Sequence, residues 1–153
     1  MTAMKFLPLY SEHLSDCLSL EASAGKNPWP ESSFKQVFNA NKLCYGAFDE
    51  HDRLMAIGVL QVVVDEATVL NISVRGEAQN QGLGRRMMEQ LITKALDEGC
   101  SNMFLEVRES NVSAQNLYLK LGFNEINRRA NYYPTHDGQR EAAIEMALAL
   151  GLD

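Results

Sequence analysis

The segment from residue 67 to residue 107 restricts the fold more than any other part of the chain. It starts with a run of β-branched and apolar residues over 67–74, and a glycine-containing turn leads into a stretch whose apolar residues recur at helical spacing. That stretch stops at Gly99, a residue type that commonly ends helices, and an alternating run over 101–107 follows. This order predicts two parallel strands joined by a right-handed crossover helix.

Four further runs of β-branched and apolar residues predict strands outside this unit. They cover residues 43–48, 54–64, 123–133 and 142–148. Short turns separate the first two runs from each other and from the strand at 67–74, which predicts an antiparallel meander. The predicted fold class is therefore mixed α/β, with a central, mostly antiparallel sheet that contains one parallel pair and is flanked by helices. With 153 residues, the chain is expected to form a single domain over 1–153.

Helical spacing of apolar residues predicts three helices besides the crossover helix. The first has Ser11 as its candidate N-cap and leaves Glu21, among other acidic residues, to solvent. The first turn of the second helix contains Pro30, a residue type that fits this position. The third ends at Gly122.

Composition and charge narrow the class of function. The chain has 14 Lys and Arg against 20 Asp and Glu, a formal net charge of −6, which disfavours a nucleic-acid partner and suits a cationic substrate. No apolar run approaches the roughly 18 residues of a membrane span, and no signal peptide is evident, so we expect a cytoplasmic protein without a membrane partner. The three cysteines form no ligand pattern with histidine, so no metal is expected.

The sequence Gln79-Asn80-Gln81-Gly82-Leu83-Gly84-Arg85 lies between a predicted strand and the start of the crossover helix. Its glycines allow a close approach of the backbone to a ligand, and the unpaired N–H groups of the first helical turn favour an anion. The segment lacks the third glycine of a dinucleotide-binding fingerprint and the Gly-Lys-Ser/Thr of a P-loop. Spacing alone therefore leaves two alternatives: a phosphate site, or a helix start at which the glycines only relieve backbone strain.

The pattern Gln79-x-x-Gly82-x-Gly84 after a strand resembles the acetyl-CoA pyrophosphate loop of the GCN5-related N-acetyltransferases (GNAT). A second block matches the same superfamily: Asn111-x-x-Ala114-x-x-Leu117-Tyr118-x-x-x-Gly122-Phe123. The resemblance spans nearly the whole chain. It implies the GNAT acyl-CoA acyltransferase fold, with acetyl-CoA as cosubstrate.

Three further motifs resemble the RimI family of bacterial ribosomal-protein-alanine N-acetyltransferases. They are Asn27-Pro28-Trp29, Leu105-Glu106-Val107-Arg108, and Arg128-Arg129-Ala130-Asn131-Tyr132-Tyr133-Pro134 with Asp137-Gly138 after it. This resemblance implies direct transfer of acetyl to the N-terminal alanine amine of a ribosomal protein, whose basic N-terminus is the expected partner. The sequence departs from the superfamily at Asn80, where Arg is frequent, and at Gly76, where proline is common.

The resemblance also implies which residues contact the acetyl donor. The backbone of Ile72, Ser73 and Val74 would lie along the pantetheine arm, and the pyrophosphate would be surrounded by Asn80, Gln81, Gly82, Leu83, Gly84 and Arg85. Asn111 would contact CoA through its side-chain amide. The residue has an equally weighted alternative role, since asparagine at this position is also a good helix N-cap.

Glu106 and Tyr118 are the expected catalytic residues. Glu106 is at the carboxyl end of a predicted strand, where ligand crevices form, and a carboxylate there is able to accept the amine's proton directly or through water. Its alternative is a surface charge or a partner of Arg108. By family analogy Tyr118 donates a proton to the CoA thiolate, whereas its alternative is a core tyrosine. The backbone N–H of Val74 is the candidate oxyanion donor.

Two rival functions remain open at this stage. The first is an acetyltransferase of the same fold that acts on a lysine or a small-molecule amine. The second is a non-catalytic acyl-CoA-binding module. Tyr132 and Tyr133 either pack as strand aromatics or line a peptide entrance. The oligomeric state is left open, a monomer included.

Overall fold

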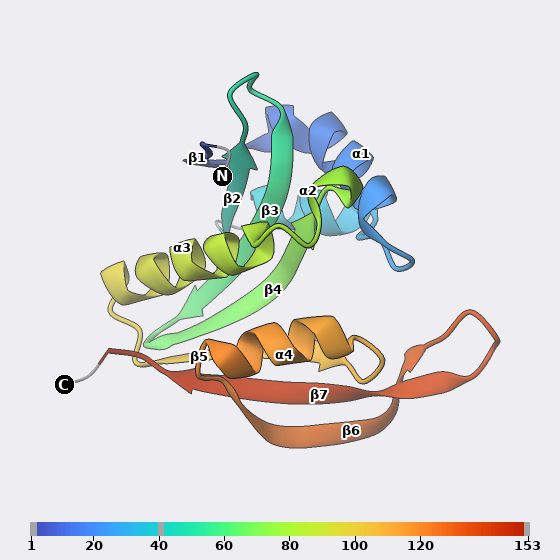
Figure 1. Cartoon of the computed structure of the whole chain (residues 1–153). Helices are drawn as coiled ribbons and strands as arrows, with labels where there is room; N and C mark the ends of the chain where they lie inside the picture. The colour runs from blue at the N-terminus through green and yellow to red at the C-terminus, as the bar shows by residue number, and fades with distance from the viewer. Residues whose placement is uncertain (1–2, 40–41, 152–153) are drawn as a thin grey trace.

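A seven-stranded sheet forms the centre of the protein, with the strand order β1-β2-β3-β4-β5-β7-β6 (Figure 1). The computed structural model describes residues 3–39 and 42–151. The strands are β1 (Lys5–Pro8), β2 (Leu43–Phe48), β3 (Leu54–Val63), β4 (Glu66–Val74), β5 (Asn102–Arg108), β6 (Asn124–Pro134) and β7 (Arg140–Ala149). The α-helices are α1 (Leu14–Ala24), α2 (Glu31–Asn39), α3 (Leu83–Asp97) and α4 (Val112–Lys120), with short 3-10 helices at Ser11–His13 and Gly76–Ala78.

β4 and β5 are the parallel pair of an otherwise antiparallel sheet, and they pair over only part of their length. Glu66 to Val69 face Asn102 to Leu105, and the ladder stops there. A register shift against β3 leaves Leu70 as an extra residue in β4, a β-bulge directly after the last residue paired with β5. Because a bulge bends its strand, β4 turns away from β5, and the two halves of the sheet diverge towards the right of Figure 1.

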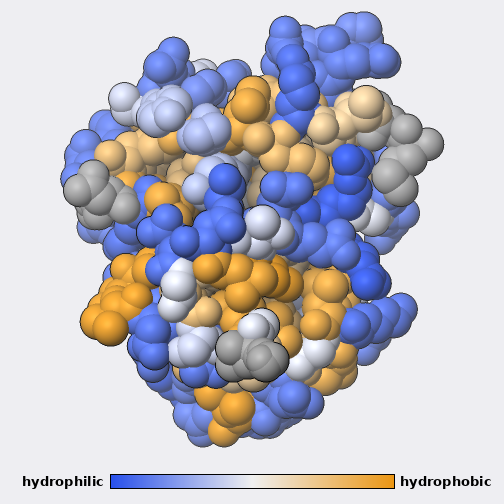
Figure 2. Space-filling model, turned by 90° about the vertical axis from the view of Figure 1, so that its left-hand side faces the viewer, coloured by the Kyte–Doolittle hydropathy of each residue, from blue (hydrophilic) through white to orange (hydrophobic). Residues whose placement is uncertain are grey.

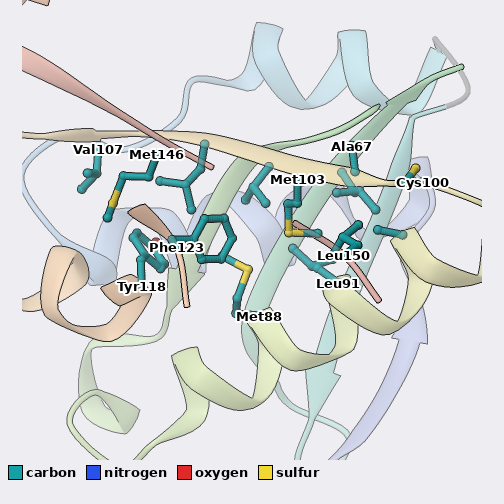
Figure 3. Packing of buried hydrophobic residues seen from close by; sticks show 14 of the residues in the cluster. Ala67, Met88, Leu91, Cys100, Met103, Val107, Tyr118, Phe123, Met146 and Leu150 are labelled. Atoms are coloured by element: carbon teal, nitrogen blue, oxygen red, sulfur yellow. The ribbon is translucent and has the colours of Figure 1, made fainter. Parts of the chain in front are cut away.

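Helices cover both faces of the sheet. α1 and α2 pack on one face around a cluster that includes Cys17, Leu20 and Phe34. α3 and α4 pack on the other face, where Met88 of α3 lies beside Phe123 and Tyr118 of α4 (Figure 3). The sheet is therefore a middle layer whose two faces have separate cores.

The structure confirms the predicted mixed α/β class, the meander and the parallel pair with its crossover helix. It adds the short strand β1, which pairs with β2. Two local expectations were wrong. Ser11 begins a 3-10 turn rather than capping α1, and Glu21 is buried, with 4% of its surface exposed. Glu21 follows Cys17 and Leu20 at the spacing of one helical stripe, so it shares their buried face.

The end of the molecule at the left of Figure 1 lies where β4 and β5 pair. Val63 at the end of β3, Val64 in the turn after it and Leu96 of α3 are exposed hydrophobic residues. Figure 2 looks at this end and shows small hydrophobic patches separated by hydrophilic groups. No helix among the described residues is long and apolar enough to cross a membrane.

Replacing Phe34 shows how much the core of the α1/α2 face contributes to the free energy of unfolding. Its side chain is fully buried, and its ring contacts Trp29 at 5.1 Å between centroids. We predict that Phe34→Ala lowers the free energy of unfolding by about 3–5 kcal/mol, because it removes buried surface and leaves a cavity. Urea denaturation measures this loss. Lys35→Ala, one position along on the exposed side of the same helix, should cost less than about 0.5 kcal/mol, and an equal loss in both variants would contradict the assignment.

Candidate active site

A cleft of about 780 Å³ opens where β4 and β5 part. Its walls come from the end of α1 and the segment after it, from β4, from the start of α3, from β5 and from α4. Both predicted catalytic residues, Glu106 and Tyr118, line it. The cleft is thus formed by elements from both halves of the sheet and both of its faces.

The glycine loop forms the wall of the cleft at the start of α3. Gly82 is the N-cap of α3 with φ +81°, and Asn80 also has a positive φ, +63°. Both values lie in the left-handed region that glycine and asparagine tolerate best. The amide of Gln79 donates from Nε2 to the carbonyls of Ala24 (2.7 Å) and Val74 (3.0 Å), which ties the loop to α1 and β4. The loop is therefore held in place by its own side chain.

The side chains of the loop divide between two sides. Asn80, Gly82, Leu83, Gly84 and Arg85 line the cleft. Gln81 lines a smaller pocket of about 440 Å³ and its amide donates weakly to the carbonyl of Glu77 (3.4 Å), so its side chain faces away from the cleft. Arg86 lies at that pocket too, with its guanidinium 5.5 Å from the centre of the Phe6 ring. Of the two successive arginines, Arg85 is the one at the cleft.

The glycine at position 76, where proline is common in the superfamily, has a structural explanation. Its N–H donates to the hydroxyl of Ser23 (3.1 Å), and a Cβ at this position would lie 2.5 Å from the backbone oxygen of Ser23. Proline has no N–H to donate. The close approach of α1 to the end of β4 therefore requires glycine here.

The edge of β4 turns backbone groups towards the cleft. The N–H of Arg75 donates to the carbonyl of Met55 (2.8 Å), so these two residues form a hydrogen-bonded pair. Such pairs alternate along an antiparallel ladder, which turns the N–H and C=O of Val74 and Ile72 away from β3, towards the side where β5 has parted. Ser73 lies between them and points its backbone groups at β3 instead.

Tyr118 reaches the cleft from the face that α3 and α4 cover. It is 8% exposed, and its ring lies 5.9 Å from that of Phe123. Burial raises the pKa of Tyr118 to about 12. The phenol therefore keeps its proton at neutral pH and is able to donate it to a basic atom in the cleft.

Glu106 lies on the opposite face of the sheet. Met103, Leu105 and Val107 of β5 belong to the core under α3 and α4, so the alternation of the strand turns Glu106 to the α1/α2 side. Its side chain is 31% exposed and lies 3.4 Å from the guanidinium of Arg129. The expected alternative partner, Arg108, pairs with Glu141 instead (3.2 Å).

The hairpin of β6 and β7 carries aromatic side chains to the same edge of the cleft. Tyr133 and Glu106 both line the cleft. Burial, and after it the charge of Glu106, raises the pKa of Tyr133. Arg108 packs against the ring of this tyrosine, with its guanidinium 4.5 Å from the ring centre. It also donates a hydrogen bond to the carbonyl of Pro134 (2.9 Å). Tyr132 is 41% exposed and packs against Tyr133.

Asn111 lies at the start of α4 and lines the cleft. Its Oδ1 accepts a hydrogen bond from the N–H of Ala114 (3.2 Å), which confirms the N-cap. The cap uses only the amide oxygen. Contact of the amide nitrogen with CoA stays a prediction.

Two polar residues of the cleft were missed by sequence reasoning. Glu21 accepts hydrogen bonds from the backbone N–H of Trp29 (2.7 Å) and from Nδ2 of Asn71 (3.0 Å). The helical spacing of Glu21 with Cys17 and Leu20 was a signal that could have placed it inside. Asn71 gave no such signal, because the bulge that turns it towards α1 is not visible in a strand pattern.

The cysteines and metal-ligand residues add no further chemistry to the cleft. Burial raises the pKa of both Cys17 and Cys44 to about 12, so neither is a reactive thiolate at neutral pH. Within residues 3–39 and 42–151, no group of three or more His, Cys, Asp or Glu side chains is arranged to hold a metal ion.

An anion-binding helix start in one cleft with a proton donor and a carboxylate fits an acyl-CoA-dependent acetyltransferase. The chain belongs to the acetyltransferase (GNAT) family, whose family model matches residues 10–123. Acetyl-CoA is the acetyl donor of this family and of this chain. The open approach to Gly82 and Gly84 at the cleft fits a ligand whose phosphates contact backbone N–H groups.

Individual relatives share one name. The chain is 43% identical over 133 residues to the ribosomal protein bS18-alanine N-acetyltransferase of Escherichia coli (strain K12), which is 87% of this chain and 88% of that protein. It is 39% identical over 131 residues to the enzyme of the same name from Haemophilus ducreyi, covering 86% and 90% of the two chains. A crystal structure of the Escherichia coli ribosomal-protein-alanine N-acetyltransferase superposes with a TM-score of 0.91 at 39% identity, over 99% of this chain and 96% of that one.

Gly84 offers the sharpest test of the predicted donor site. A Cβ at this position would lie in ordinary van der Waals contact with Val74 (3.7 Å) and Leu117 (3.8 Å), so a side chain fits the fold but takes up space at the cleft. We predict that Gly84→Val lowers the affinity for acetyl-CoA about tenfold or more, because it blocks the approach of the pyrophosphate to the first turn of α3. Gly82→Val is less informative, since the φ of +81° at that position would add backbone strain.

Isothermal titration calorimetry with acetyl-CoA measures the effect of Gly84→Val. The matched control is Thr93→Val, which places the same side chain in α3 but away from the cleft lining. Unchanged affinity in folded Gly84→Val protein would remove the assignment of this loop to the pyrophosphate.

Proposed function

We propose that this protein transfers the acetyl group of acetyl-CoA to the N-terminal alanine amine of a ribosomal protein, the homologue of bS18. The observation that carries the proposal is a single cleft that joins Glu106 and Tyr118 from opposite faces of the sheet, in a chain 43% identical to enzymes of that activity. Direct transfer fits this cleft, because none of the three cysteines, all of them among the described residues, lines it to form an acyl-enzyme.

The reaction requires that two protons move in a defined order. The neutral amine attacks the thioester carbonyl, and the N–H of Val74 is the donor proposed for the oxyanion that forms. The nitrogen becomes cationic in the tetrahedral intermediate and passes one proton to the carboxylate of Glu106, directly or through a water. The C–S bond then breaks, and the thiolate takes the phenolic proton of Tyr118. The products are the acetylated N-terminus and CoA. Solvent then takes the proton from Glu106 and returns one to Tyr118.

The acetyl donor, acetyl-CoA, is proposed to lie along β4 and on the glycine loop. The backbone of Ile72 and Val74 would bond the pantetheine arm at the parted edge. The N–H groups at the start of α3 would hold the pyrophosphate together with the side chain of Arg85. The backbone of Ser73 faces β3, so we assign it no backbone contact with the pantetheine arm.

The lower pKa of a terminal amine favours it over lysine as the nucleophile. With a pKa of about 7.7–8.0, roughly a tenth or more of an α-amine is neutral at pH 7, against well under a thousandth of a lysine whose pKa is about 10.4. Glu106 then has to assist the proton's departure rather than create the nucleophile. The formal net charge of −6 favours encounter with a basic N-terminus at low salt. We place the reaction in the cytoplasm, without nucleic acid or membrane as a direct partner, and assign it to one domain over 1–153.

The substrate proposal predicts which amine of a peptide reacts. We expect acetylation of an alanine-initiated, Arg/Lys-rich peptide at its terminus, detected as a single added acetyl group by mass spectrometry. The same peptide with its terminus chemically blocked and its lysines free is the control. If the blocked peptide is acetylated as fast as the free one, the chain is a lysine acetyltransferase.

The two catalytic residues have distinct expected signatures. Tyr118→Phe should lower kcat about 10²- to 10⁴-fold while acetyl-CoA affinity changes little, since the hydroxyl acts only when the intermediate collapses. Glu106→Gln should show a comparable loss. Steady-state kinetics together with calorimetry separates turnover from binding. Lys120→Ala, also in α4 but outside the cleft lining, is the control, and near-normal turnover of Tyr118→Phe would make Tyr118 a packing residue only.

A further inference from the structure

Glu21 is a buried carboxylate with no cationic partner among the described residues. It is 4% exposed and lines the cleft from α1, and no Lys, Arg or His of residues 3–39 and 42–151 lies within ion-pair distance of it. Its oxygens accept hydrogen bonds from two neutral donors, the N–H of Trp29 and the amide nitrogen of Asn71. Burying a carboxylate without a cationic partner is costly, even where hydrogen bonds offset part of the cost.

One consequence of this carboxylate is the orientation of the Asn71 amide. A carboxylate only accepts hydrogen bonds, so Asn71 must turn its NH₂ group towards Glu21. The amide oxygen Oδ1 of Asn71 is thereby turned the other way, where it accepts a hydrogen bond from the hydroxyl of Ser73 (3.2 Å). A carbonyl oxygen has two lone pairs, so Oδ1 has capacity for one more donor.

Asn71 lies at the apex of the cleft on the same face as Glu106. It faces Val59 across the β3–β4 ladder, and Val59 belongs to the core under α1 and α2. It comes two positions after Val69, the last residue of β4 that pairs with β5, and Glu106 comes one position after the last paired residue of β5. The two side chains therefore stand on the two diverging strands, and both are turned to the α1/α2 face of the sheet.

We propose that Oδ1 of Asn71 accepts a hydrogen bond from the reacting amine, and that Glu21 is a positioning residue that fixes the Asn71 amide for this contact. The proposal rests on the proposed function and names an additional specificity element of the same site. A neutral primary amine has two N–H groups and one lone pair. With one N–H on Asn71 and the other on Glu106, the lone pair points in the third direction, towards the thioester.

Glu21→Gln tests the proposal with a side chain of the same shape. A glutamine that still accepts from the N–H of Trp29 presents its NH₂ to Asn71, so the Asn71 amide must reverse and offer its own NH₂ to the substrate amine. We expect kcat/KM for the alanine-initiated peptide to fall about tenfold, with acetyl-CoA affinity unchanged within about twofold. Glu31→Gln, the same change on an exposed carboxylate of α2, is the matched control.

Two further measurements separate positioning from a general structural role. In a double-mutant cycle, Glu21→Gln should have no additional effect on kcat/KM once Asn71→Ala is present, because Glu21 acts through Asn71. A peptide with propionyl in place of the N-terminal alanine lacks the amine, and its inhibition constant should be the same for the unmodified protein and for Glu21→Gln.

The outcomes are distinct. Equal weakening of the amine-free inhibitor and the substrate by Glu21→Gln, or multiplying effects of the two substitutions, would overturn the role given to Glu21 and Asn71. If instead the unmodified protein fails to acetylate the peptide terminus, the proposed function itself fails, and this is read in the same assay before any variant is compared.

Discussion

The parting of β4 from β5 is the constraint on which the site depends. Parallel strands that stayed paired over their full length would close the sheet and leave no passage from one face to the other. Here the extra residue at Leu70 bends β4 as soon as the pairing with Leu105 ends. The carboxyl ends of both strands then stand apart, and backbone groups that would have bonded the neighbouring strand face the cleft instead. An added strand-like ligand satisfies such groups.

This opening also explains why the two proposed proton-transfer groups lie on opposite faces. Tyr118 belongs to the apolar core under α3 and α4, where burial keeps its proton in place. Glu106 faces the more open α1/α2 side, where it meets Arg129 and Tyr133. A leaving thiolate needs an acid and an attacking amine needs a base, and the sheet separates these two environments by its own thickness. In the proposed reaction the two groups act together at the split.

Much of this arrangement could be predicted from the sequence, because it is encoded in local patterns. The 3.6-residue period of α3, the glycines that begin and end it and the alternation of β5 are properties of neighbouring residues. The side of Glu106 followed from that alternation. The position of the bulge did not, since it depends on the register between β3 and β4, and the facing of Asn71 depends on the bulge. The charge of Glu21 favours exposure, whereas its position on the stripe of Leu20 places it inside, and the position prevails.

Around the cleft, side chains replace the backbone ladder that the split removes. Gln79 donates to the carbonyls of Ala24 and Val74, and Gln115 donates to those of Arg108 and Glu109.

On the hairpin, Arg140 likewise donates to the carbonyls of Asn131 (2.9 Å) and Tyr132 (2.7 Å), across a stretch where the β6–β7 register slips. Each of these side chains binds two backbone carbonyls at once. Loops fixed in this way keep a defined shape without a strand partner, because their backbone acceptors are satisfied inside the protein. Glu21 applies the same principle with the opposite polarity, as an acceptor for donors of two walls. The polar residues of the cleft therefore serve its shape as well as its chemistry, and a substitution among them is best judged by binding and turnover measured separately.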